Sequence, residues 1–286
     1  MYTFKDLRKQ QYNFRREVFP DVFDYIRNPY SFIKTRFYIE TSTVLVWFLM
    51  KTNINPNTVT VIYGLAGIPT GILLAIPNKY TICIALFIAF TKGIIDWSDG
   101  QFARMTGQTS LTGHILDAYG AHLNSLGFQI GLGMYAAYRA DTLLFYYLVP
   151  LLLFFRAGGL FLFSRAILFE EFSSEKNVSS FQDNDSQDKN QDNININSLE
   201  RSYGKYKNLF MGFLDDRARS VDLICLIILL EIVFPINISW LVFLLIVVKY
   251  FIIFVASIYM IGKGSWAENE MMNKLRVLND AFQKKQ

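Results

Sequence analysis

The chain is poor in charged residues, histidine and cysteine. Charged residues make up 18% of its 286 positions, whereas a typical soluble domain has about 25%, and this shortage excludes an ordinary soluble enzyme. Its two histidines and two cysteines are too few for a histidine-rich or cysteine-based metal site or a disulfide framework. The formal net charge of +4 is too small to indicate a nucleic-acid partner.

Long apolar runs take the place of the missing charges. A membrane-spanning helix needs roughly 20 predominantly apolar residues, because its backbone must satisfy its own hydrogen bonds across about 30 Å of hydrocarbon. Six stretches meet this requirement: 57–77, 80–98, 113–138, 142–168, 221–235 and 237–261. The sequence therefore predicts an all-α, polytopic membrane protein with six transmembrane helices.

Lys and Arg are concentrated on one side of these predicted spans, which sets their orientation. The segment before residue 40 has eight of them, and the loops 99–112 and 169–220 and the C-terminal tail have more. The opposite side has only Lys79 and Arg139. Both termini are therefore expected in the cytoplasm, and the compact size favours a multi-pass protein of a bacterial inner (plasma) membrane.

Three regions are expected along the chain. Residues 1–40 mix basic with aromatic and aliphatic side chains at helical spacing, which predicts an amphipathic juxtamembrane segment on anionic lipid headgroups. Residues 41–262 form the six-helix membrane domain, and 263–286 a cytoplasmic tail. Within the membrane domain, residues 173–198 are rich in Asn, Asp, Gln and Ser. Such a stretch buries too little apolar surface to order itself and is expected to be a disordered cytoplasmic insert.

Acidic residues near the cytoplasmic ends of the second and third predicted spans indicate a functional site, because ionisable groups inside a membrane are costly. Asp96 and Asp99 share one helix face, and Asp117 lies near the start of the third span. The short hairpin 105–112 predicts that these two spans are antiparallel neighbours, with the three carboxylates together. Oxygen ligands without His or Cys suit Mg²⁺, Mn²⁺ or Ca²⁺.

The residues between these carboxylates suit a phosphate-bearing ligand. Gly100 and Gly113 have no side chains to block its approach to the backbone. Arg104 is always charged and has a fork-shaped guanidinium group that matches phosphate. The local sequence therefore predicts a metal-assisted phosphoryl or diphosphate site that opens toward the cytoplasm.

Seven residues of this region stand at the spacing of a known signature: Asp96, Asp99, Gly100, Ala103, Arg104, Gly113 and Asp117. With Asn55-Pro56-Asn57-x-x-Thr60 before the first span, the pattern resembles that of the CDP-alcohol phosphotransferases, and is most similar to the branch that uses CDP-choline or CDP-ethanolamine. The resemblance implies transfer of a phospho-alcohol group from a CDP-alcohol to the hydroxyl of an alcohol or lipid acceptor. CMP is released, and the product is a phospholipid or related phosphodiester.

The resemblance also implies roles for individual residues. In this family the first three aspartates hold two divalent cations, Mg²⁺ or Mn²⁺, that bind the diphosphate, which here implies Asp96, Asp99 and Asp117. The CDP pocket is implied to be lined by Gly100, Ala103, Arg104 and Gly113. Gly127-x3-Gly131 on the third span has a spacing that suits close helix packing or a homodimer.

One position departs from the family pattern. The fourth aspartate, the expected base, falls at Ala121, which can neither accept a proton nor bind a cation. One interpretation is that His122, beside Ala121, or His114, one turn before Asp117, replaces this catalytic base. A second is an acceptor that is already ionised. A third is a catalytically impaired family member that acts as a membrane nucleotide- or lipid-binding protein.

Overall fold

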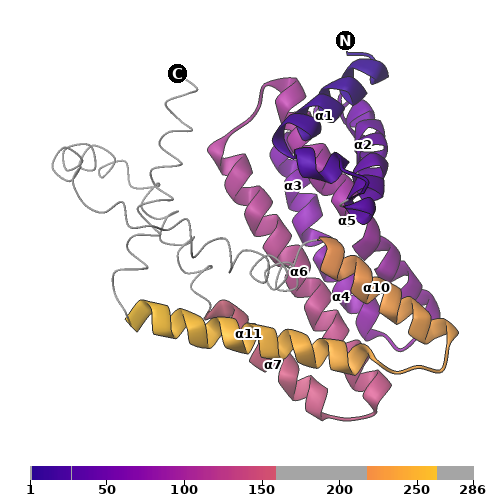
Figure 1. The fold of residues 1–286 in the computed structure, drawn as a ribbon, viewed down its shortest axis with the longest axis vertical. Coiled ribbons are helices and arrows are strands. Elements are labelled where there is room, and N and C mark those ends of the chain that lie inside the picture. Colours follow the sequence, from indigo (N-terminus) through magenta and orange to yellow (C-terminus); the bar gives the residue numbers. More distant parts are fainter. Residues whose placement is uncertain (1, 27, 159–217, 263–286) are drawn as a thin grey trace. The chain divides into compact units, whose positions relative to one another are not determined.

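The computed structural model describes residues 2–26, 28–158 and 218–262, which form helices and no strands (Figure 1). The all-α prediction is confirmed for this part of the chain. The expected insert 173–198 and the tail 263–286 lie outside the described residues. The helices are α1 (Phe4–Val18), the 3₁₀ helix η1 (Pro20–Phe23), α2 (Pro29–Leu49), α3 (Pro56–Leu65), α4 (Gly67–Ala75), α5 (Lys79–Thr106), α6 (Leu111–Ala140), α7 (Leu144–Ala157), α10 (Ala218–Val233) and α11 (Ser239–Gly262).

Three helical segments of the described chain are long and apolar enough to cross a membrane. They are Pro56–Ala75, Lys79–Thr106 and Ser239–Tyr259. α7 is apolar but only 14 residues long, and α10 has 16 residues. α6 has 30 residues, but polar side chains in its first half lower its hydropathy. These helices are consistent with a membrane protein, and three of the six predicted spans are supported by length and composition.

The chain divides into two compact units, one formed by residues 1–145 and 216–243 and the other by 146–215 and 244–286. All candidate site residues belong to the first unit. In the second unit, α7 and α11 meet through aromatic rings: the ring centroid of Phe155 lies 5.2 Å from that of Phe251 and 5.5 Å from that of Phe254.

Capping residues fix where the helices of the site begin and end. The Asn55 side chain accepts a hydrogen bond from the backbone N–H of Asn57 at 2.9 Å, with Pro56 at the first position of α3, a favourable combination. Ser110 accepts from the N–H of Gly113 at 3.0 Å and starts α6. α5 ends at Gly107, whose φ of 69° lies in the left-handed region, where glycine is favoured.

α6 packs against α3 and α4 along a seam of glycines. This glycine seam consists of Gly64, Gly67 and Gly71 on α3 and α4, and Gly120, Gly127 and Gly131 on α6. A Cβ atom placed on Gly64 would lie 2.9 Å from the Cα of Gly120, and one on Gly131 would lie 2.6 Å from the carbonyl oxygen of Gly71. The close packing predicted for Gly127-x3-Gly131 therefore takes place within this chain.

The glycine seam also changes which helices are neighbours. The short loop between α5 and α6 predicts that these two helices lie side by side. Instead, α6 packs extensively on α3 and α4, while α5 packs on α2 as well as on α3 and α4, and α3 lies between α5 and α6 (Figure 1). Glycine lets the backbones of α6 and α3–α4 approach closely, so α6 packs there rather than along α5.

We predict that Gly127→Ala destabilises the protein. The added methyl group would press on the backbone of Gly67, and overpacking costs about 1–3 kcal/mol, more than the roughly 1 kcal/mol that alanine gains over glycine in a helix. The thermal unfolding midpoint in detergent should fall. The matched control is Gly100→Ala on α5, where the new Cβ would meet only the flexible end of Arg104, at 3.3 Å. Equal thermal unfolding midpoints for the two variants would contradict close backbone packing at the glycine seam.

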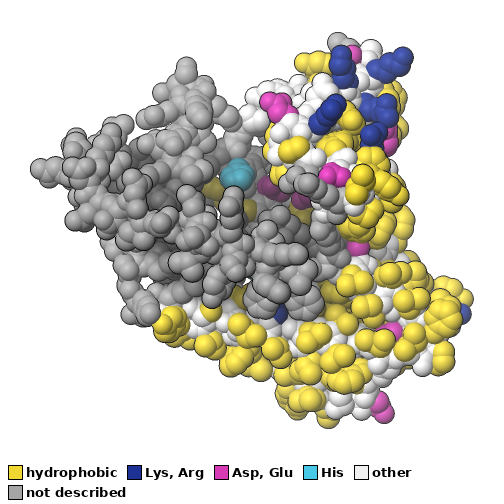
Figure 2. All heavy atoms as spheres, viewed as in Figure 1, with side chains coloured by type: hydrophobic (Ala, Val, Ile, Leu, Met, Phe, Trp, Pro, Cys, Tyr) yellow, Lys and Arg dark blue, Asp and Glu magenta, His cyan; other side chains and the backbone are white. Residues whose placement is uncertain are grey.

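α1 lies against α2 and the C-terminal part of α5. The side chain of Leu7 is fully buried in a cluster with Val46, Val59 and Phe102, and its carbonyl oxygen accepts a hydrogen bond from Gln101 at 3.0 Å. α1 therefore turns its buried face toward the other helices. Figure 2 shows Lys and Arg side chains gathered over the α1 and α2 end. α2 runs through residue 40, the expected end of the juxtamembrane segment.

Polar contacts hold α10 near both of its ends. Close to its start, Asp222 forms an ion pair with Lys34 of α2, and their side chains are only 9% and 12% exposed. Close to its end, Glu231 accepts a hydrogen bond of 2.5 Å from the N–H of Ser239 and lies 3.7 Å from Nε of Arg139. Glu231 thus caps the start of α11 and joins it to the end of α6.

Candidate functional site

Three helices bring the predicted site residues to one region of the first unit. They are the beginning of α3, the C-terminal half of α5 and the beginning of α6. A Cβ on Gly113 of α6 would lie 3.1 Å from Oδ1 of Asn57 on α3. On α5, Asp96 lies beside the hydroxyl of Tyr63, and Asp99 lies beside the hydroxyl of Thr60. The motif that begins the first span and the aspartate motif therefore form one site.

The three signature carboxylates lie close enough for their charges to interact. The negative charge of Asp117 on α6 acts on both Asp96 and Asp99 on α5. Asp99 is 5% exposed, and its Oδ2 is buried without a hydrogen-bond partner. Asp96 is half-buried and Asp117 is exposed. Carboxylates gathered in this way repel one another unless a cation or hydrogen-bond donors offset their charge.

The donor chemistry of this group fits a hard divalent cation. Carboxylate oxygens are ligands that Mg²⁺ and Mn²⁺ prefer, and the buried Oδ2 of Asp99 needs a partner that the described residues do not supply. Within those residues, however, no three His, Cys, Asp or Glu side chains form a ready set of ligands around one point. The assignment of Asp96, Asp99 and Asp117 as metal ligands stays a prediction.

Two contacts hold the side chain of Arg104 in place among the residues expected to bind CDP. One of its terminal nitrogens donates to Oε1 of Gln11 at 2.9 Å, and its guanidinium carbon lies 3.7 Å from the ring centroid of Phe14. Its Nε is buried without a partner. A Cβ on Gly100 would lie 3.3 Å from a terminal nitrogen of Arg104. The absence of a side chain at Gly100 therefore leaves space for the Arg104 guanidinium group. Ala103 is half-buried nearby on α5.

Arg15 of α1 also belongs to this site, although the sequence analysis did not identify it. Its guanidinium carbon lies 3.7 Å from the ring centroid of Trp97, the residue after Asp96. Burial lowers the pKa of Arg15, and the negative charges of Asp96, Asp117 and Asp99 act in the opposite direction. One signal was present in the sequence: Leu7, Gln11 and Arg15 recur every four residues, so two polar residues continue the buried face of an amphipathic helix.

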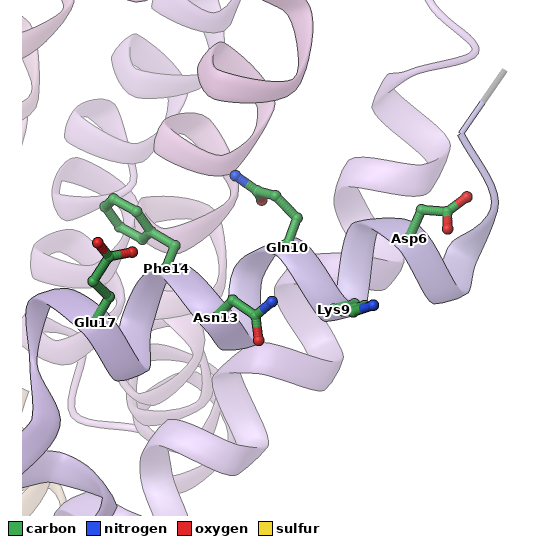
Figure 3. A pocket seen from close by; sticks show the side chains of 6 residues that line it. All are labelled: Asp6, Lys9, Gln10, Asn13, Phe14 and Glu17. Carbon is green, nitrogen blue, oxygen red and sulfur yellow. The ribbon is translucent and has the colours of Figure 1, made fainter.

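A groove of about 480 Å³ runs along α1 beside these contacts. The described residues that line it are Asp6, Lys9, Gln10, Asn13, Phe14 and Glu17 (Figure 3). Phe14 therefore has two roles, since its ring lines the groove and also stacks on Arg104. The groove and the candidate site share this side chain.

The two histidines lie on different sides of α6. Gly120 marks the side that packs on α3, and an α-helix turns by about 100° per residue. Relative to Gly120, Asp117 and Ala121 lie at about 60° and 100°, and His114 at about 120°. His122 lies at about 200°, on the far side. His114 is exposed and His122 half-buried. The helix geometry favours His114 as the neighbour of Asp117 and Ala121.

Comparison with protein families gives a match over part of the chain. Residues 53–170 match the sequence model of the family described as CDP-alcohol phosphatidyltransferase. No curated protein matches the chain, and no solved structure matches it. The matched segment contains the whole signature and lies C-terminal to α1 and α2. The family consists of transferases that act on CDP-alcohol donors and alcohol acceptors in phospholipid synthesis. The chain therefore carries a CDP-alcohol phosphatidyltransferase domain at residues 53–170.

Proposed function

We propose that this chain transfers a phospho-alcohol group from a CDP-alcohol to an acceptor hydroxyl and releases CMP. The observation that carries the proposal is the buried Oδ2 of Asp99, which has no hydrogen-bond partner and stands between the signature residues Asp96 and Asp117 in the segment that matches the family. A site with this many negative charges suits a cation-assisted diphosphate reaction.

In the proposed reaction, the acceptor oxygen forms a bond to the phosphorus that bears the alcohol. The bond from that phosphorus to the oxygen bridging to CMP breaks, and CMP leaves with the electron pair. The proton of the acceptor hydroxyl passes to a base. Mg²⁺ or Mn²⁺ ions held by Asp96, Asp99 and Asp117 would neutralise negative charge on the diphosphate.

The side chains around the carboxylates have matching roles in this proposal. Arg104 has a buried, unpartnered Nε and a guanidinium fork that suits phosphate oxygens. Gly100 and Gly113 leave the backbone open to the nucleotide. Tyr63 beside Asp96 and Thr60 beside Asp99 position the two carboxylates of α5.

The base in this proposal is His114. It lies on the same side of α6 as Asp117 and Ala121, about 20° around the helix from Ala121, and its exposure leaves it open to solvent, to which the proton can pass. An imidazole has an intrinsic pKa suited to proton transfer near neutral pH. His122 lies about 100° from Ala121, farther from the acceptor side.

Ala121 favours a second candidate function. Without the fourth aspartate, the chain can retain a nucleotide pocket but lose turnover, and it would then act as a membrane protein that binds a nucleotide or lipid. The sites proposed for CDP and for the metal are shared by the two functions, so only turnover separates them.

The test is CMP release by the purified full chain in lipid nanodiscs with Mn²⁺, against a panel of CDP-alcohols and acceptor alcohols. The transferase proposal predicts CMP release with at least one pair and none after a chelator is added. Binding of CDP without CMP release across the panel would favour the binding protein. Absence of CDP binding would contradict both functions.

A further inference from the structure

We propose that Arg15 of α1 binds the diphosphate of the nucleotide substrate, at the phosphate that bears the alcohol. This inference rests on the proposed function, because it names a further ligand of the same substrate. It extends the site beyond the segment that matches the family, which begins at residue 53.

The position of Arg15 is the first observation. Its guanidinium group lies 3.7 Å from the centroid of the Trp97 ring, so a cation–π contact holds it over α5 next to Asp96. Its Nε is buried and has no hydrogen-bond partner. Within the described residues, Arg15 forms no ion pair with a carboxylate oxygen within 4.0 Å, although three carboxylates act on its charge. Its hydrogen-bonding capacity remains available.

A second guanidinium group nearby, that of Arg104, also has a buried nitrogen without a hydrogen-bond partner. Arg104 is stacked on Phe14, its Nε also lacks a partner, and the charges of Arg15 and Arg104 act on each other. Two like charges held close together in a partly buried place are unfavourable unless an anion joins them. A diphosphate, with two linked anionic groups, fits two forked cations better than a single carboxylate does.

Contacts between α1 and α5 keep the pair in place. Gln101 donates to the carbonyl oxygen of Leu7, and Arg104 donates to Gln11. Both hydrogen bonds join α1 to α5. Arg15 lies one turn beyond Gln11 on the same face of α1. α1 brings Arg15 to the carboxylates as a preorganised side chain.

The assignment of Arg15 to one of the two phosphates follows from the different positions of the two arginines. Arg104 stands at a signature position expected to line the CDP pocket, so it serves the CMP half of the substrate. Arg15 lies on the other helix, over Trp97 and beside Asp96. We therefore assign the remaining phosphate, the one that carries the alcohol, to Arg15.

The test is the affinity of the full chain in nanodiscs for CDP and for CMP, measured in the presence of Mg²⁺. Arg15→Gln is expected to weaken CDP binding by about 10- to 100-fold, the effect of losing a charged hydrogen bond, with CMP affinity changed less than about 2-fold. Arg15→Lys, which keeps the charge but loses the fork, should lie between the two. Arg16→Gln is the matched control, because Arg16 is the adjacent, exposed arginine.

The outcomes separate this inference from the proposed function. If the wild-type chain does not bind CDP, the proposed function is wrong. If it binds CDP and Arg15→Gln behaves like Arg16→Gln, the function stands and the role of Arg15 is overturned. Equal weakening of CDP and CMP would also overturn it, because a damaged pocket affects both ligands. Should Arg15→Gln fail to fold by its thermal unfolding midpoint, the ratio of CDP to CMP affinity in Arg15→Lys decides, and an unchanged ratio rejects the role.

Discussion

Asp96→Asn is expected to reduce CMP release by about 100- to 1,000-fold, the usual effect of removing a preorganised charge from an active site. Asp96 has several charged neighbours: the charges of Asp117, Arg15 and Lys92 act on it, and it lies beside the hydroxyl of Tyr63. Asparagine has the same shape but no charge, so the protein should fold while a predicted metal ligand is lost. The measurement is the initial rate of CMP release in nanodiscs at saturating donor.

The control is the same substitution where no role is expected. Asp141 is exposed at the end of α6, with a φ of 49°, a conformation that asparagine also adopts readily. Asp141→Asn should retain the wild-type rate and the wild-type unfolding midpoint. A rate for Asp96→Asn within 10-fold of that for Asp141→Asn would argue against a catalytic site at the aspartate cluster.

In a chain that is impaired because it lacks the fourth aspartate, Ala121→Asp is expected to raise the rate of CMP release by about 100-fold or more, the usual contribution of a positioned general base. Ala121 lies one turn beyond Asp117 on the same side of α6, and it is half-buried. A carboxylate there can reach the acceptor side of the site without entering the glycine seam, since Ala121 is about 100° from Gly120 around the helix.

A carboxylate elsewhere on α6 tests whether position matters. Ala118 is also half-buried, but it lies about 160° from Gly120, away from the line of Asp117 and Ala121. Ala118→Asp should leave the rate unchanged. If only Ala121→Asp is active, the native chain is the impaired, binding form of the family. If Ala121→Asp gains nothing over an active wild type, another group already serves as the base, and His114→Gln should then lower the rate.

Local patterns in the sequence place the predicted carboxylates on their helices and mark where those helices begin. Helical periodicity alone places Asp96 and Asp99 on one face of α5, and the capping residues Asn55 and Ser110 fix where α3 and α6 start. Thr60 and Asp99 each belong to a motif that stands in the sequence. These features are local or carried by a signature, which is why they can be read from one chain.

The remaining features depend on tertiary contacts that local patterns do not encode. Loop length predicted α5 and α6 as neighbours, but the backbone contacts at Gly127 and Gly131 placed α6 on α4. Arg15 looked like one more basic residue for lipid headgroups, and only the packing of α1 shows it over Trp97.

The glycine seam has a further consequence for how Asp117 is positioned. Since its contacts join backbone to backbone, they fix the rotational phase of α6 and leave no side chain that could adjust to a shift. Gly120 and Gly127 are seven residues apart, close to two turns of about 3.6 residues each. An insertion of one residue between Asp117 and Gly120 would keep the seam but turn Asp117 by about 100°. In this fold, chain length between a carboxylate and a glycine determines which way the carboxylate faces.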